Sequence, residues 1–322
     1  MSRLFPVVRI LLAAVAVLGA GALHAQGYPA KPLRFVTTGA GGTTDFVVRT
    51  IVQGLADSAG WNVIVDNRGS TIVAAELVSR SPPDGYTLLV LTEGLWRGPL
   101  LQKMPYDFAR DFLPITLVSR APNLLVVHPS LPVKSVKELI ALAKARPGEL
   151  NYGAGAIGAA THMASEMFKL MAGVNIVYIP YKSSAQALIA IVSGQLQVMF
   201  ATSGGVMPHI KSGRVRALAI STLQPSALAP GLPTIAAAGN LPAYESAATA
   251  GVFAPAGTTE AIVNRVSGEV RKVLTKPEVR ERFLTQGVEA VGLSPGETVA
   301  YIRADTATTG RLIRDAGIRL ER

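Results

Sequence analysis

Two glycine-rich segments are the parts of the sequence best suited to hold a ligand. Residues 39–45 and residues 152–162 each follow a short apolar run and precede a segment with helical periodicity. A glycine-rich turn at the start of a helix exposes backbone N–H groups beside the positive end of the helix dipole, which suits a carboxylate or a phosphate. One such turn alone is usually only a tight turn. Two of them, in different halves of the chain, favour an anion held between the halves.

The second segment also fits a dinucleotide fingerprint. Gly153, Gly155 and Gly158 match G-x-G-x-x-G between an expected strand and an expected helix. That fingerprint needs an Asp or Glu about 20 residues further on to bind the ribose, and residues 174–183 contain none. The segment at 39–45 lacks the Gly-Lys-Ser/Thr ending of a P-loop. The sequence therefore disfavours NAD and nucleotide hydrolysis, and we expect no cofactor.

Residues for catalysis or metal binding are sparse. The chain contains no cysteine, and no serine sits in a G-x-S-x-G elbow between an expected strand and an expected helix, so it has no recognisable nucleophile. His162 and Glu166 lie four residues apart on an expected helix and could supply two metal ligands, but no second histidine motif accompanies them. An enzyme that uses these two residues with Lys182 is the alternative from a different functional class. We expect neither catalysis nor a metal.

Other polar residues lie at the ends of expected strands. Lys182 could reach an anionic ligand or could be a solvated surface lysine. Asp45, in the first helical turn, suits the helix dipole and is interpreted as mainly structural. Thr92, Glu93 and Trp96 follow the apolar strand expected over 86–91. Ligands in open α/β sheets bind beyond the carboxyl ends of the strands, so these three positions could line a pocket.

The first residues predict export. Two arginines, an apolar run over 10–22 and small residues near Ala25 are typical of a signal peptide over 1–25. The apolar run is shorter than the roughly 20 residues that span a bilayer, so we expect cleavage, after Ala25 or alternatively after Ala22. A formal net charge of +10 favours anionic ligands. The basic residues are scattered as single positions, which does not favour nucleic acid.

The periodicity predicts two α/β lobes. Short apolar runs alternate with amphipathic stretches, which is typical of βαβ units and parallel sheets, first over 33–91 and again over 124–220. Three helices are expected at the end of the chain, over 260–274, 278–286 and 295–316, with Thr258 or Thr259 and Ser294 as N-caps. Because no low-complexity linker is present, we expect strands to cross between the lobes near 120–124 and 248–252. Lobe 1 then comprises 26–121 plus 249–322, and lobe 2 comprises 122–248.

Taken in order, several motifs resemble the solute receptors of tripartite tricarboxylate transporters, the TctC or Bug family. They cover nearly the whole chain after the expected signal peptide and are specific only in combination. The motifs are Tyr28-Pro29-Ala30-Lys31-Pro32, Gly41-Gly42-Thr43-Thr44-Asp45, Asp66-Asn67-Arg68, Pro83-Asp84-Gly85-Tyr86-Thr87-Leu88, Pro105-Tyr106-Asp107, Asn151-Tyr152-Gly153, Thr161-His162-Met163, Pro180-Tyr181-Lys182, His209-Ile210-Lys211-Ser212-Gly213, Arg216-Ala217-Leu218-Ala219 and Ala254-Pro255-Ala256-Gly257-Thr258.

The resemblance implies a periplasmic type II binding fold, with two Rossmann-like lobes that close on a small carboxylate. It implies no catalysis and no cofactor, a monomer, and delivery of the ligand to the membrane permease of a tripartite transporter. An orphan receptor for a sensor kinase is the alternative within the same class. The family's ligand-binding positions correspond to Thr38, Gly41, Gly42, Thr43, Thr44, Thr92, Glu93, Gly94, Ala154, Gly158, Ala159, Ala160, Thr161, Tyr181, Lys182, Ser183, Ala201 and Thr202.

The chain departs from the family pattern at the pocket. The first turn usually reads Pro-Phe-x-Pro-Gly-Gly, whereas residues 37–42 read Thr-Thr-Gly-Ala-Gly-Gly. The family often has Gly after Tyr-Lys and Asp after the strand that ends in Phe, where this chain has Ser183 and Ala201. Loss of that Asp removes a partner for an amino group. We therefore hypothesise that the ligand is a carboxylate without an amine.

Overall fold

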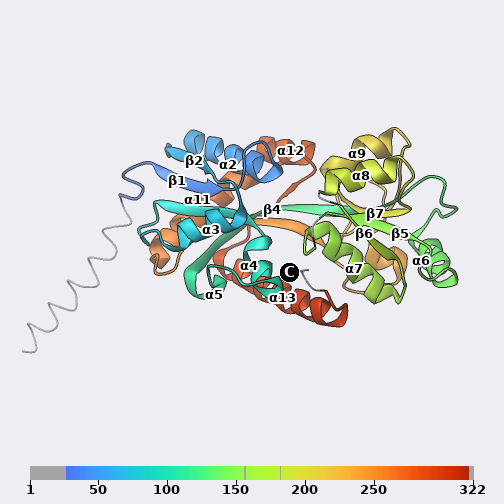
Figure 1. Cartoon of the computed structure of the whole chain (residues 1–322). Helices are drawn as coiled ribbons and strands as arrows, with labels where there is room; N and C mark the ends of the chain where they lie inside the picture. Colours follow the sequence, from blue (N-terminus) through green and yellow to red (C-terminus); the bar gives the residue numbers. More distant parts are fainter. Residues whose placement is uncertain (1–26, 156, 182, 319–322) are drawn as a thin grey trace, which may run out of the picture.

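The computed structural model describes residues 27–155, 157–181 and 183–318. The expected signal peptide and Lys182 lie outside these residues. Figure 1 shows two α/β lobes side by side, with strands passing between them. The two-lobed α/β fold expected from the sequence is confirmed. No helix within 27–155, 157–181 or 183–318 is long and apolar enough to cross a membrane.

The first lobe begins with a parallel sheet in the order β2-β1-β3, in which Phe35 pairs with Val65 on one side and Leu88 on the other. Leu33, Phe35 and Val36 are fully buried, because helices cover both faces of this sheet. Its elements are β1 (Leu33–Thr37), α2 (Thr43–Ala59), β2 (Val63–Asn67), α3 (Thr71–Ser79), β3 (Thr87–Thr92), α4 (Gly94–Leu101) and α5 (Phe108–Asp111).

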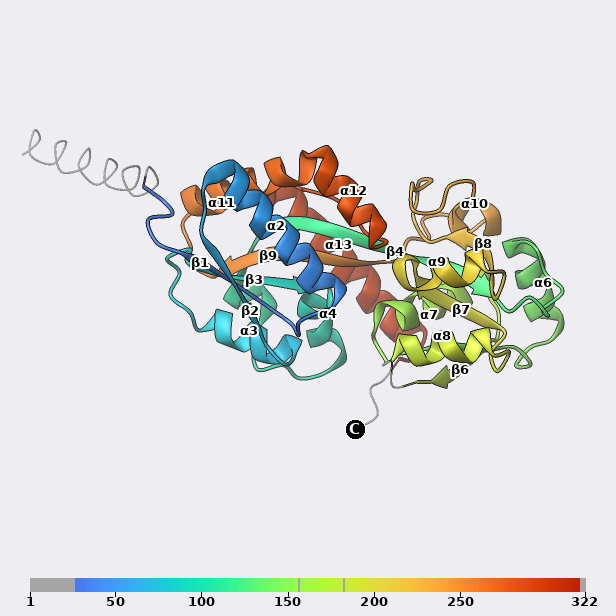
Figure 2. The same ribbon diagram turned by 90° about the horizontal axis from the view of Figure 1, so that it is seen from above.

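Two long strands, β4 (Phe112–Val127) and β9 (Ala247–Pro255), connect the lobes. They pair antiparallel from Phe112 opposite Pro255 to Pro122 opposite Ala247. Beyond this stretch β4 pairs with two strands of the second lobe. Figure 2 shows β4 running from one lobe into the other. The central strands are thus antiparallel to their neighbours, unlike the wholly parallel sheets expected from the βαβ pattern, because strand periodicity carries no information about direction.

The second lobe surrounds a second core built on Tyr152, Phe168, Phe200 and Tyr244, which are all buried. In its sheet β5 pairs parallel with both β6 and β7. Its elements are α6 (Val136–Ala145), β5 (Asn151–Ala154), α7 (Ala160–Ala172), β6 (Val177–Pro180), α8 (Ser184–Val192), β7 (Val198–Thr202), α9 (Ser203–Lys211), β8 (Arg216–Ile220) and α10 (Ile235–Gly239).

The last part of the chain returns to the first lobe through α11 (Glu260–Thr275), α12 (Pro277–Thr285), β10 (Glu289–Ala290) and α13 (Pro295–Asp315). β10 pairs with β4, and α11 packs against α2. Ser294 starts α13 with a capping box in which Glu297 bonds back to the Ser294 amide. In both views α12 faces α9 across the junction between the lobes (Figures 1 and 2).

Candidate functional site

A cavity of about 230 Å³ lies between the two lobes. It opens where the carboxyl ends of β1, β3 and β7 approach the junction, as expected for a ligand site in open α/β sheets. The crossing strands form its floor, and no charged side chain of a described residue lines it. Its lining comprises Thr43, Thr44, Val47, Thr92, Ser119, Ala121, Thr202, Gly204, Gly205, Ala248, Ala250, Thr285, Gln286, Gly287 and Val288.

Two helix N-termini from opposite lobes border this cavity. α2 starts after Gly42 and α9 starts after Thr202, and no side chain accepts a hydrogen bond from the first turn of either helix. Some other helices are capped: Ser135 accepts from a first-turn amide of α6, and Thr234 does so for α10, whereas α4, α7, α11 and α12 also lack a side-chain cap but do not start at the cavity. The first turns of α2 and α9 therefore retain N–H donors for an anion in the cavity.

Hydroxyl groups add further donors. Thr43, Thr44, Thr92, Ser119 and Thr202 all line the cavity, and none of their hydroxyls hydrogen-bonds to another described residue. Ser119 is only 3% exposed, so its hydroxyl has little access to solvent other than through the cavity. Buried hydroxyls normally have partners. This arrangement suits a ligand with several oxygen acceptors.

The first glycine-rich turn is held by Asp45. Its carboxylate accepts from the amide of Gly41 at 3.0 Å, from Arg49 Nε at 3.0 Å and from Asn67 Nδ2 at 2.9 Å. Burial opposes ionisation of this carboxyl, but the hydrogen bonds from Arg49, Gly41 and Asn67 outweigh it and hold the Asp45 pKa below its ordinary value. Asn67 also donates to the carbonyl of Thr38 at 2.8 Å. Thr38, Gly41 and Gly42 therefore position the start of α2 without lining the cavity.

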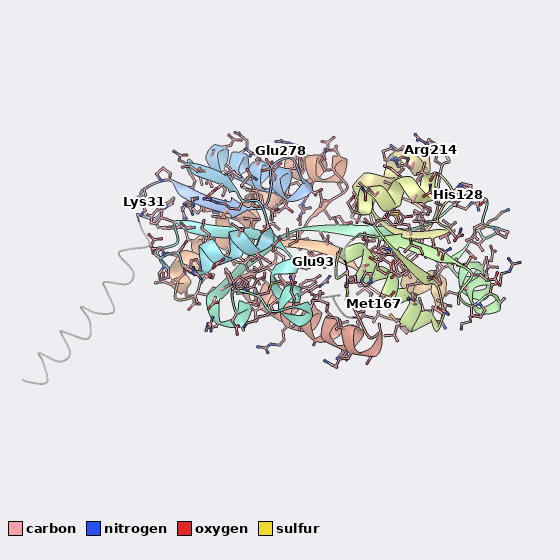
Figure 3. The ribbon with its side chains drawn as sticks, in the orientation of Figure 1. Lys31, Glu93, His128, Met167, Arg214 and Glu278 are labelled. Carbon is pink, nitrogen blue, oxygen red and sulfur yellow. The ribbon has the colours of Figure 1, made fainter. Side chains whose placement is uncertain are left out.

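The residues at the end of β3 have two different roles: one lines the cavity, and the next binds the crossing strand β9. Thr92 lines the cavity, whereas the Glu93 carboxylate accepts from the amide of Thr249, on β9, at 2.8 Å. Figure 3 places Glu93 near the junction of the lobes, far from Lys31 and His128 at their outer ends. Burial raises the Glu93 pKa, although the charge of nearby Arg97 opposes this rise. Neither Glu93 nor Gly94, which begins α4, is among the lining residues.

The second glycine-rich turn contacts the first lobe outside this cavity. A Cβ on Gly158 would lie 2.3 Å from Leu101 Cδ1 of α4, and its φ of +83° also favours glycine. Tyr178 donates to the carbonyl of Gly155 at 2.7 Å, and the hydroxyls of Thr161 and Ser184 lie 3.2 Å apart. Eight more expected site residues do not line the cavity either: Ala154, Gly158, Ala159, Ala160, Thr161, Tyr181, Ser183, which caps α8, and Ala201, which is buried in the second lobe.

His162 and Glu166 stabilise this turn and the helix behind it. Glu166 Oε1 accepts from the Tyr152 hydroxyl at 2.5 Å and from Lys169 at 2.7 Å. His162 Nδ1 accepts from the amide of Gly158 at 3.4 Å, and burial lowers the His162 pKa. No group of three or more metal-ligating side chains occurs within the described ranges. The pair therefore contributes to local structure.

Several cavity residues were not expected from the sequence. Ser119, Ala121, Ala248 and Ala250 lie on the crossing strands, Thr285 is the last residue of α12, and 286–288 follow that helix. Gly204 and Gly205 follow the apolar strand β7, and this strand-glycine-helix pattern, the same as in the other two turns, could have identified them. Nothing in the sequence marks the turn after α12.

Residues 47–318 match the protein family described as "Tripartite tricarboxylate transporter family receptor", TctC. The protein BugT of Bordetella pertussis is 32% identical over 330 residues, which covers 100% of this chain and 99% of BugT. The solved structure "R. palustris Rpa4515 with adipate" is 36% identical with a TM-score of 0.77, and the match covers 91% of this chain and 99% of that one. MatC from Rhodopseudomonas palustris "with bound malate" is 26% identical with a TM-score of 0.71, covering 89% of this chain and 100% of that one.

Proposed function

The chain belongs to the TctC or Bug family of tripartite tricarboxylate transporter receptors, and on that premise we propose that it binds a small carboxylate between its lobes and delivers it to a membrane permease. Members of this family are solute-binding receptors and not enzymes. We further propose that it acts in the periplasm after removal of residues 1–25. The lobe boundaries predicted from the sequence are part of the same proposal.

One observation carries the proposal of carboxylate binding: two uncapped helix N-termini from opposite lobes and five free hydroxyls surround one cavity. Helix N-termini bind anions through backbone N–H groups and the helix dipole. The donors come from both lobes, so a bound carboxylate bridges them and favours closure. We propose Thr43, Thr44, Thr92 and Thr202, already expected from the sequence, as ligand contacts, together with Ser119.

The size and lining of the cavity also support a small acid without an amine. A volume of about 230 Å³ is below the roughly 300–1,000 Å³ that is usual for drug-sized ligands. No carboxylate side chain of a described residue lines it to accept an ammonium group. The nearby Glu93 carboxylate is engaged by the Thr249 amide. An amino acid would therefore bury its ammonium group without an anionic partner, which is costly.

The test is a thermal-shift screen of residues 26–322, followed by calorimetric titration. The panel contains mono-, di- and tricarboxylates, aromatic acids, amino acids matched to their deamino analogues, and NAD. A ligand at about 100 times its Kd stabilises the folded state by about 2.7 kcal/mol. A concentration-dependent rise in Tm with an amine-free carboxylate is the expected result. No rise with any carboxylate, or a rise only with NAD, contradicts the proposal, and tighter binding of the amino acids contradicts the exclusion of the amine.

A further inference from the structure

The turn at the end of α12, which comprises the last helical residue Thr285 and residues 286–288, forms a wall of the cavity although it belongs to neither glycine-rich segment. It is fixed to the first lobe on both sides. Phe283, whose carbonyl accepts from the amides of Gln286 and Val288, is fully buried in the core, and β10 pairs with β4 directly after the turn. The turn therefore moves with the first lobe.

The same turn touches the second lobe at the start of α9. Ser203 is fully buried, and its hydroxyl donates to the carbonyl of Gly287 at 2.6 Å. A second contact on this edge joins the hydroxyl of Ser226 to the carboxylate of Glu289. These two hydrogen bonds join segments that are far apart in the sequence and lie on opposite sides of the junction.

The backbones of the two segments are in close contact between these hydrogen bonds. A Cβ on Gly287 would lie 2.2 Å from the amide nitrogen of Gly204, and a Cβ on Gly204 would lie 2.5 Å from the carbonyl oxygen of Gln286. Gly287 also has φ of +70°, which glycine adopts without strain. Any side chain at either glycine would separate the lobes at this point.

Gln286 supplies the polar group on this wall. It lines the cavity, and its side-chain amide makes no hydrogen bond to another described residue. Gln286 is exposed, and its side-chain amide offers two donors and one acceptor oxygen. Gln286 and the α9 residues Gly204 and Gly205 line the same cavity, so a ligand there can contact both sides of the Ser203–Gly287 hydrogen bond.

From these contacts we propose that the turn at 285–288 is a third ligand-binding segment, in which Gln286 contacts the bound acid and the Ser203–Gly287 contact locks the lobes around it. The inference rests on the proposed function, because it assigns further residues to the same site. Ser203 is a positioning residue: it holds the turn against α9. Ligand contact and lobe closure are coupled here, because residues 203–205 take part in both.

The experiment measures the binding of C4 to C6 dicarboxylates, adipate among them, by calorimetry. Small-angle X-ray scattering with and without ligand measures lobe closure. Gln286→Glu places a negative charge beside the bound acid and is expected to weaken affinity by about tenfold or more. Gln195→Glu is the matched control, since Gln195 is exposed in the turn after α8 and outside the cavity. It is expected to bind as the wild type does.

Gly287→Ala tests whether the Ser203–Gly287 contact holds the lobes together around the ligand. Gly213 has the same φ of +70° with no atom within 4 Å of an added Cβ, so Gly213→Ala imposes the same backbone strain without the clash. Gly287→Ala is expected to lose the ligand-induced compaction and about tenfold in affinity, whereas Gly213→Ala keeps both. Ser203→Ala is expected to speed ligand dissociation with little effect on association.

The outcomes separate this inference from the proposed function. Failure of the wild-type protein to bind any carboxylate contradicts both the proposed function and this inference. The other outcome is that the wild type binds a carboxylate, Gln286→Glu binds it as tightly as Gln195→Glu does, and Gly287→Ala matches Gly213→Ala in affinity and compaction. That outcome overturns the third ligand-binding segment alone and leaves the receptor function in place.

Discussion

The guanidinium of Arg97, on α4, and the carboxylate of Asp305, on α13, form a two-point ion pair. Arg97 Nε lies 2.8 Å from Asp305 Oδ2 and Nη2 lies 2.6 Å from Oδ1, and Trp96 Nε1 donates to the same carboxylate at 2.7 Å. The two charged side chains are only 10% and 14% exposed. Burial opposes the charge on Arg97, but the bonds to Asp305 outweigh it and raise the Arg97 pKa. The pair thus fixes the position of α4, the helix that follows Thr92 of the cavity in the sequence.

Replacing one partner of this pair is expected to destabilise the protein strongly. Arg97→Met leaves the buried Asp305 carboxylate without its cation, which costs about 3–5 kcal/mol, whereas the double variant Arg97→Met with Asp305→Leu recovers most of that loss. Arg80→Met is the control, because Arg80 is 73% exposed in its pair with Glu76 and such pairs contribute about 0–1 kcal/mol. Urea unfolding measures all three. Equal stability of the two single variants would refute the prediction.

Thr202 and Thr234 provide a matched test of which threonines serve the ligand. Both are helix N-caps, but the Thr234 hydroxyl accepts from the amide of Ala237 at 3.2 Å, whereas the Thr202 hydroxyl caps nothing and lines the cavity. Thr202→Val is expected to leave the apo Tm unchanged and to weaken ligand binding by about 2- to 12-fold, the value of one net hydrogen bond of about 0.5–1.5 kcal/mol.

Thr234→Val is expected to show the reverse: a loss of about 1 kcal/mol in unfolding free energy with unchanged affinity. Thermal unfolding of the apo proteins and calorimetric titration separate the two effects. A Thr202→Val protein that loses stability and retains its affinity would place this hydroxyl in the fold and remove it from the site.

The fold could be predicted from the sequence to the level of elements. The alternation of apolar runs with amphipathic stretches predicts β1 to β3 and the helices between them, and the capping signals at Ser294 predict the start of α13, where the capping box is found. The antiparallel direction of β4 and β9 could not be predicted, because a buried strand has the same apolar pattern in either direction. The direction is decided by hydrogen bonding between strands that lie far apart in the sequence.

The cavity could be predicted only where its residues follow a strand. Thr43, Thr44 and Thr92 were expected on that basis and Thr202 from the family resemblance alone, and all four line it, whereas the turn at 285–288 lies there because β10 pairs with β4. Glu93 follows a strand too, but its buried carboxylate needs hydrogen-bond donors and accepts from the Thr249 amide. Such choices depend on tertiary contacts that no local pattern contains.

Asp45 is expected to make stability depend on acid pH. Because its folded pKa lies below the ordinary value of 3.8, the unfolded chain takes up the proton first as the pH falls. The stabilisation by Asp45 is therefore complete at neutral pH and is lost as the pH drops below about 4. Asp45→Asn is expected to be less stable than the wild type at pH 7, with the gap closing in acid. Urea unfolding across this range measures the gap, and a constant gap would contradict the assignment.

His162 is expected to add a second dependence, nearer neutral pH. Burial lowers its pKa from the ordinary 6.5, Glu166 raises it and Lys169 lowers it, while the ring packs edge-on against Tyr178. A histidine buried in its neutral form takes up a proton more readily when unfolded, so the stability it provides is lost as the pH falls below about 6.5. Protonation of Nδ1 would also remove the acceptor for the Gly158 amide and loosen the second glycine-rich turn.

His162→Asn tests this, because an asparagine carbonyl can take the place of Nδ1 as acceptor but cannot be protonated. Its Tm is expected to change less between pH 7 and pH 5 than that of the wild type. His128→Asn serves as the control, since His128 bonds Ser130 on the outer part of the second lobe. If His162→Asn and the wild type lose Tm in parallel over this range, some other group takes up the proton, and the Gly158 contact is not what couples the turn to pH.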